Sequence, residues 1–180
     1  MTLDERITIS EPGLIFGPFD ACDLLWLERS PAYLGLPSSH GVKIAEFAWA
    51  KMSGSRRMTY VVEAQKSFPR PENSKAAIQE LKEKFANALA LIAALKAGLH
   101  AAHATALPTS FQSTSMADLA HQLVLVIPDI PSEQCEGVRV LLARGLRSIT
   151  SLWDLDDPAI AVMNRQIAIR QGLIHANASS

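Results

Sequence analysis

The sequence is poor in cysteine and lacks the short motifs that hold nucleotides. Its two cysteines, Cys22 and Cys135, lie far apart, which excludes a disulfide framework and a Cys-x-x-Cys metal site. Neither GxGxxG nor GxxxxGK[ST] occurs, so a loop that cradles phosphates is not expected. The five histidines show no ligand spacing beyond His100-x-x-His103, which has no cysteine or acid beside it. Core or surface positions are the expected role of the histidines.

An excess of charge of one sign and a long hydrophobic run are also missing. Lys and Arg total 17 against 18 Asp and Glu, and the formal net charge of -1 excludes a globally basic nucleic-acid-binding protein. Any site for a polyanion must then be local. No apolar run approaches the roughly 20 residues that a membrane-spanning helix needs, and residues 1–10 contain no apolar signal core. We therefore expect a cytoplasmic protein that does not contact a membrane.

Hydrophobic residues are plentiful, at 48% of the 180 residues, which is enough for one packed core. We expect a single α/β domain over residues 1–174, followed by a frayed tail at 175–180. Short apolar runs separated by turn residues from Arg6 to Arg29 predict a small antiparallel meander. Val42–Lys51 and Met58–Phe68 predict the two strands of a hairpin.

Helices and further strands are expected after the hairpin. Apolar positions recur every three or four residues from Ser74 to about His103, which predicts a long amphipathic helix with Lys82, Glu83 and Lys84 on its opposite side. The continuous apolar run Gln122–Ile127 predicts a strand in the middle of the sheet. The remaining expectations are a helix from about 131 to 148, short strands at 149–153 and 160–163, and a last helix at 164–172. The fold class is therefore α/β, with a mixed central sheet flanked by helices.

Two carboxylates in the hairpin are the informative residues. Glu46 interrupts an otherwise apolar strand, where burying an unpaired carboxylate costs several kcal/mol. Glu63 and Gln65 point to the same side of the second strand because side chains alternate, while Lys66 faces the other way. If the register brings Glu46 beside Glu63, the two carboxylates and the Gln65 carbonyl form an all-oxygen site of the kind that Mg²⁺ prefers.

Other interpretations of these acids stay open. Glu63 and Lys66 can form an ordinary polar strand end, with Glu46 as a partly exposed edge residue. Glu28 can be a third acid of the site if the meander packs near the hairpin, or it can pair with Arg29 or Lys43.

The order of hairpin, E-x-Q-K at the end of its second strand, long helix and buried strand resembles the PD-(D/E)XK restriction-endonuclease-like superfamily. The resemblance covers roughly Val42 to Ile127, and the chain is also similar to small bacterial proteins with an EAKS-type motif. It implies that Glu46 and Glu63 bind Mg²⁺ or Mn²⁺ for phosphodiester cleavage. It further implies that Gln65, which stands at the usual lysine position, orients the metal shell, while the displaced Lys66 stabilises the transition state.

Two functions are therefore expected from the sequence. The first is a metal-dependent nuclease-like protein that acts on nucleic acids, with Arg56, Arg57, Lys66 and Arg70 as phosphate contacts because Lys and Arg outnumber acids around the motif. The basic residues can equally be a solvated helix face and a turn. The second function is a catalytically inactive nuclease-fold protein that serves as an interaction or regulatory module, possible as a homodimer through the alanine-rich segment Ala86–Leu107.

Overall fold

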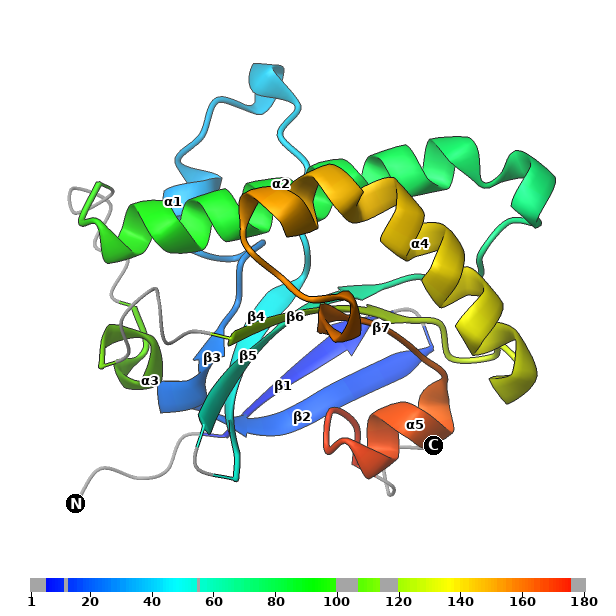
Figure 1. The fold of residues 1–180 in the computed structure, drawn as a ribbon. Helices are drawn as coiled ribbons and strands as arrows, with labels where there is room; N and C mark the ends of the chain where they lie inside the picture. Colours follow the sequence, from blue (N-terminus) through cyan, green and yellow to red (C-terminus); the bar gives the residue numbers. More distant parts are fainter. Residues whose placement is uncertain (1–5, 12, 55, 100–106, 114–119, 176–180) are drawn as a thin grey trace.

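A mixed β-sheet forms the centre of the molecule (Figure 1). The computed structural model describes residues 6–11, 13–54, 56–99, 107–113 and 120–175. Within them the sheet has five strands in the order β3-β4-β5-β6-β7. Neighbours from β3 to β5 are antiparallel, whereas β5, β6 and β7 run parallel. The strands are β3 (Leu24–Leu25), β4 (Phe47–Ser53), β5 (Arg56–Ala64), β6 (Ala120–Val126) and β7 (Ile160–Met163).

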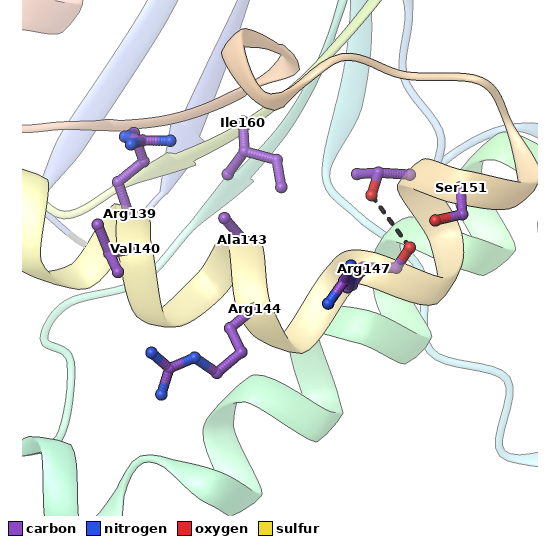
Figure 2. Close-up of a pocket in the computed structure, with 8 residues that line it drawn as sticks. Arg139, Val140, Ala143, Arg144, Arg147, Ser151 and Ile160 are labelled. Carbon is purple, nitrogen blue, oxygen red and sulfur yellow. Dashed lines mark hydrogen bonds between the residues drawn. The ribbon is translucent and has the colours of Figure 1, made fainter.

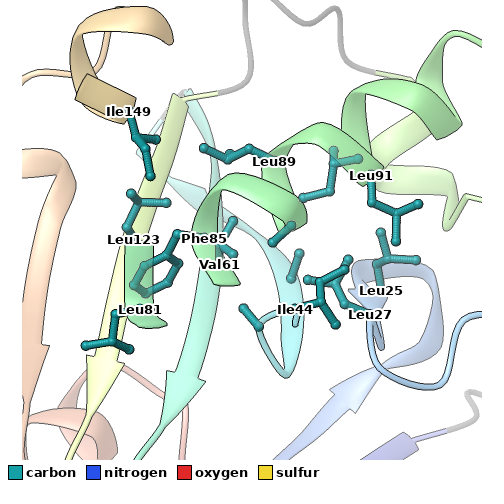
Figure 3. Packing of buried hydrophobic residues seen from close by; sticks show 14 of the residues in the cluster. Leu25, Leu27, Ile44, Val61, Leu81, Phe85, Leu89, Leu91, Leu123 and Ile149 are labelled. Carbon is teal, nitrogen blue, oxygen red and sulfur yellow. The ribbon is translucent and has the colours of Figure 1, made fainter. Parts of the chain in front are cut away.

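Two long helices cover one face of this sheet, α2 (Lys75–Lys96) and α4 (Ser132–Leu152). Alternation along β5 turns Val61 and Glu63 toward the helices, and Leu81 and Phe85 of α2 pack against Val61 in the main apolar core (Figure 3). The two helices approach closely, since a Cβ built on Gly145 of α4 would lie 2.1 Å from Cγ2 of Ile78 on α2. The two helices therefore pack on the sheet and on each other.

A smaller layer covers the opposite face. It consists of the hairpin of β1 (Arg6–Glu11) and β2 (Leu14–Asp20) together with α5 (Arg165–Arg170). Phe16 of β2 meets Phe47 of β4 edge to face, with ring centroids 5.2 Å apart. Two single-turn α-helices are also present, besides several short 3-10 helices. They are α1 (Pro31–Leu34), which Ser30 caps by accepting a hydrogen bond from the Tyr33 N–H, and α3 (Thr109–Gln112).

Most of the elements predicted from the sequence are confirmed. The hairpin, the long helix, the strand in the middle of the sheet and the strand at 160–163 are all present. The last helix begins after Asn164, whose side chain accepts a hydrogen bond from the N–H of Ile167. The α/β class, with a mixed sheet flanked by helices, follows directly from these elements.

Several predictions differ from the structure. The long helix ends at Lys96 instead of about His103, and the second hairpin strand ends at Ala64 instead of Phe68. The meander does not continue past β2, because Leu24 and Leu25 pair with Trp49 and Ala48 of the central sheet instead. Residues 149–152 belong to α4 rather than to a strand, since Ile149 continues the helical spacing of buried side chains after Leu142 and Leu146. The first hairpin strand starts at Phe47, so residues 42–46 are not part of it.

The alanine-rich part of the long helix is core. The buried residues of this part of α2 include Ala88, Leu89, Ile92 and Leu95. Residues 100–106 lie outside the described part of the chain. The feature that favoured an interaction module is therefore, over the described residues, largely covered by the protein itself. Separately, no helix in the described residues has the length and apolar character that crossing a membrane requires.

Candidate metal centre

Glu46 lies immediately before β4 and faces the helix layer. Phe47 pairs with Val62, so Glu46 precedes and Glu63 follows the last pair of the hairpin, close enough for the charge of Glu63 to act on Glu46. The backbone carbonyl of Glu46 accepts hydrogen bonds from the N–H groups of Leu27 and Glu28, at 3.1 and 3.4 Å. These two hydrogen bonds hold the segment after β3 against the residue before β4, and they explain how Glu28 reaches the site.

The carboxylates of Glu11 and Glu28 converge on that of Glu46. One carboxylate oxygen from each of Glu11, Glu28 and Glu46 lies within 4.8 Å of the other two. Glu46 is only 6% exposed, whereas Glu11 and Glu28 are half-buried. The three residues come from the end of β1, from the segment after β3 and from the start of β4, so tertiary packing brings them together.

The pairing of Glu28 with Arg29 or Lys43 is not what the structure has. The Lys43 ammonium group lies 3.5 Å from the carboxylate of Glu80. The Arg29 guanidinium lies over the ring of Trp26, 4.3 Å from its centroid. Both cations contact other groups, and the Glu28 side chain joins the acidic cluster of Glu11, Glu28 and Glu46.

Crowding of acids in a buried place changes their protonation. Burial, followed by the hydrogen bond and charge of Glu28 and the charges of Glu63 and Glu11, raises the pKa of Glu46 to about 9. The pKa of Glu11 is raised as well, again chiefly by burial. At neutral pH and without a cation, Glu46 therefore holds a proton, which relieves the repulsion inside the cluster.

Glu63 has a cation beside it, and that cation comes from α2. The Lys84 ammonium donates to Glu63 Oε1 at 2.6 Å, and the Glu63 side chain is 1% exposed. Burial raises the pKa of Glu63 to about 7 against the opposing effect of Lys84. Burial lowers the pKa of Lys84, but the Glu63 carboxylate together with the charges of Glu46 and Glu28 outweighs it, so the pKa of Lys84 is raised and the ammonium stays charged.

The sequence predicted Lys84 on the solvent side of the long helix, and this prediction is wrong. Lys84 is three residues after Leu81 and four before Ala88, both of which are fully buried. That spacing sets it on the flank of the apolar stripe, and its side chain is 17% exposed. The charge pattern of the helix led to the wrong prediction because it counted Lys84 with its charged sequence neighbours.

Two carboxylate oxygens at the site are buried without a hydrogen-bond partner in the described residues, Glu46 Oε2 and Glu63 Oε2. A buried acceptor without a partner is costly, by about 1–3 kcal/mol. Carboxylate oxygens are the ligands that Mg²⁺ and Mn²⁺ prefer, and Glu46 adds its unpartnered oxygen to those of Glu11 and Glu28. The donor set therefore fits a hard divalent cation. The burial of Glu46 contradicts its interpretation as a partly exposed edge residue. Glu63 does stand near the end of β5, but it is buried and paired with Lys84 rather than with Lys66.

Gln65, Lys66 and Arg70, which were also predicted for the site, differ in burial and in what they contact. Gln65 is half-buried, and its backbone N–H donates to the Val126 carbonyl at 2.9 Å. Lys66 and Arg70 are exposed and line a cavity of about 860 Å³ beside the start of α4. The ammonium group that contacts Glu63 is thus that of Lys84, while Lys66 faces this cavity.

Arg56 and Arg57 begin β5 and stand at the end of the strand away from Glu63. Glu63 lies six positions along the strand from Arg57, which is about 20 Å. The Arg57 guanidinium donates to the Ser110 carbonyl and to Ser113 Oγ. Arg57 therefore holds the α3 segment against the hairpin, far from the acidic cluster.

No protein-family model, curated protein or solved structure matches this chain.

Proposed function

We propose that the protein is a divalent-metal-dependent, nuclease-like phosphodiesterase with a restriction-endonuclease-like core that acts on nucleic acids. The observation that carries this proposal is the convergence of Glu11 and Glu28 on buried Glu46, whose Oε2 has no partner in the described residues. Buried acids are expected to be paired, protonated or metal-bound. Metal binding explains why three carboxylates meet at one buried place, whereas a role in packing alone does not.

Glu11, Glu28 and Glu46 would hold the cation, and Glu63 lies next to them. A bound Mg²⁺ or Mn²⁺ would polarise a phosphoryl oxygen and make a water more acidic. The sequence-based assignment of Glu46 as a ligand is kept in this proposal, with Glu11 and Glu28 added to it. Glu63, the other ligand predicted from the sequence, is the adjacent acid, and Lys84 contacts its Oε1.

Glu63 and Lys84 would carry the proton and charge chemistry. A carboxylate with a pKa of about 7 is suited to accept a proton near neutral pH. In the proposed hydrolysis, a water oxygen bonds to phosphorus, its proton passes to Glu63, and the P–O ester bond breaks with solvent protonating the leaving oxygen. The Lys84 ammonium would stabilise the negative charge that develops on the phosphate, the role predicted for Lys66 from the sequence.

A second candidate function rests on the same ion pair. Lys84 already compensates Glu63 at 2.6 Å, and Gln65 cannot supply a positive charge. A site of this kind can keep the fold and lose hydrolysis, leaving a regulatory or interaction module. The alanine-rich part of α2 would contribute little to its docking surface, because Leu89 and Ile92 are buried.

A cleavage assay separates the two functions. Single- and double-stranded nucleic acids are incubated with the protein and millimolar Mg²⁺ or Mn²⁺, and Lys84→Met is compared with Lys66→Met. We expect metal-dependent cleavage that falls about a hundredfold in Lys84→Met and changes little in Lys66→Met. Because removing one partner of a buried ion pair can cost about 3–5 kcal/mol of stability, folding is checked by circular dichroism and Glu63→Gln serves as a second variant.

Each result of the assay has one meaning. A large loss in Lys66→Met with full activity in Lys84→Met would contradict the role of Lys84. If the folded wild-type protein cleaves neither substrate with either metal, the nuclease proposal fails and the inactive module takes its place.

A further inference from the structure

Three arginines of α4 project from the helix, with Arg139 and Arg144 on different sides of it (Figure 2). Arg139, Arg144 and Arg147 line a cavity of about 490 Å³ that also includes Thr150 and Ser151 and contains no Asp or Glu in its lining (Figure 2). Arg144 and Arg147 are exposed. Arg139 differs from them, since its guanidinium donates twice to the carboxylate of Glu136, each time at 2.8 Å. The charge available to a ligand is therefore mainly that of Arg144 and Arg147.

A second cavity continues the positive surface onto α2. This cavity, of about 280 Å³, lies between the two helices and is lined by Lys75, Lys82 and Arg144, again without an Asp or Glu in the lining. Arg144 borders both cavities. The close packing of Gly145 on Ile78 holds the two helices together at this place, so the cations stand on a rigid support.

The spacing of these cations suits a phosphate backbone. Lys75 and Lys82 are seven residues apart, about 10 Å along a helix, and packed helices lie about 8–10 Å from each other. One strand of a nucleic acid carries a negative charge about every 3.4 Å along the duplex axis, so several phosphates pass within reach of two such rows. Guanidinium groups also bind phosphate oxygens in a bidentate manner.

We propose that Lys75, Lys82, Arg144 and Arg147 form a basic surface that binds the phosphate backbone of a nucleic acid. This surface is distinct from the acidic cluster, because Glu46 precedes β4 at one side of the sheet while α4 packs on β7 at the other. It also differs from the residues predicted from the sequence, of which Arg57 holds α3. The proposal goes beyond the metal-dependent function, since phosphate binding here requires no metal.

The test measures binding of a short fluorescently labelled duplex and of its single strand by anisotropy, in EDTA and over a range of salt concentrations. Arg144→Gln/Arg147→Gln is compared with Arg6→Gln/Arg170→Gln, which removes the same charge from β1 and α5 on the opposite layer. We expect the first variant to bind about tenfold more weakly or worse at low salt. The slope of log affinity against log salt should also fall by nearly two.

The control variant should keep both the affinity and the slope of the wild-type protein. Equal losses in the two variants would show a general effect of net charge and would overturn the proposal. So would wild-type binding by Arg144→Gln/Arg147→Gln, or absence of binding at low salt by the folded wild-type protein. Competition by polyglutamate as strong as that by unlabelled duplex would point to an acidic protein segment instead and would also overturn it. Because EDTA is present throughout, failure of the metal site leaves this result unchanged.

Discussion

At the residue scale, the site is governed by a glutamate that is neutral when no cation is bound. The pKa of Glu46 is about 9 in the folded protein, against an ordinary value of 4.5 in an unfolded chain. Between these values the folded protein holds a proton that the unfolded chain has lost, so stability falls as pH rises through this range. His121 acts in the opposite direction at lower pH, because burial lowers its pKa from 6.5 to about 4.

Stability of the metal-free protein should therefore decrease from about pH 8 to 9. In this range His121 no longer titrates, and Glu63, whose pKa is about 7, has already lost its proton. One proton bound more tightly by the folded state gives a slope of at most about 1.4 kcal/mol per pH unit. In Glu46→Gln, which cannot ionise at this position, the decrease should be much smaller. Urea unfolding in EDTA at several pH values measures both proteins. A decrease as steep in Glu46→Gln as in the wild type would show that Glu46 is ionised already.

At the scale of elements, local sequence patterns predicted the hairpin and the helices. They could not predict which strands pair with each other in the sheet. The helical spacing of Leu81, Phe85 and Leu89 is set within one turn or two and was therefore visible in the sequence. The pairing of Leu24 with Trp49 depends on which strand edge is free after folding. The end of α4 was missed because β-branched Ile149 and Thr150 suggest a strand, while burial of Ile149 against the core keeps the helix.

Packing of α2 on α4 makes two glycines of one helix behave differently. A Cβ at Gly137 would meet nothing within 4 Å, whereas a Cβ at Gly145 would lie 2.1 Å from Ile78 Cγ2. Gly137→Ala should stabilise the protein by about 0.5–1 kcal/mol through helix propensity. Gly145→Ala should destabilise it by about 1 kcal/mol or more, since overpacking outweighs the same gain. Chemical denaturation measures both, and equal stabilisation by the two variants would mean that the helices are not in close contact at Gly145.

At the scale of the whole molecule, the candidate site combines residues from four separate parts of the chain. Glu46 and Glu63 were predictable because they share one hairpin, whose register is local. Glu28 was one of two open alternatives in the sequence, and its place in the cluster agrees with the interpretation as a third acid. Glu11 and Lys84 were not predicted, because they reach the site through β1 and α2 and their approach depends on packing of layers on both faces of the sheet. The spacing of residues in the sequence does not predict such long-range packing. The same reason explains why the basic surface of α2 and α4 was not anticipated.

The central claim is that the acidic cluster of Glu11, Glu28 and Glu46 binds a divalent cation, and a crystal soaked in millimolar Mn²⁺ tests it directly. Anomalous diffraction locates manganese without reference to any activity, and crystals of Glu46→Gln serve as the control. We predict an anomalous peak between the three carboxylates in the wild type and its loss in Glu46→Gln. A wild-type crystal with ordered carboxylates and no anomalous peak among them would contradict the account.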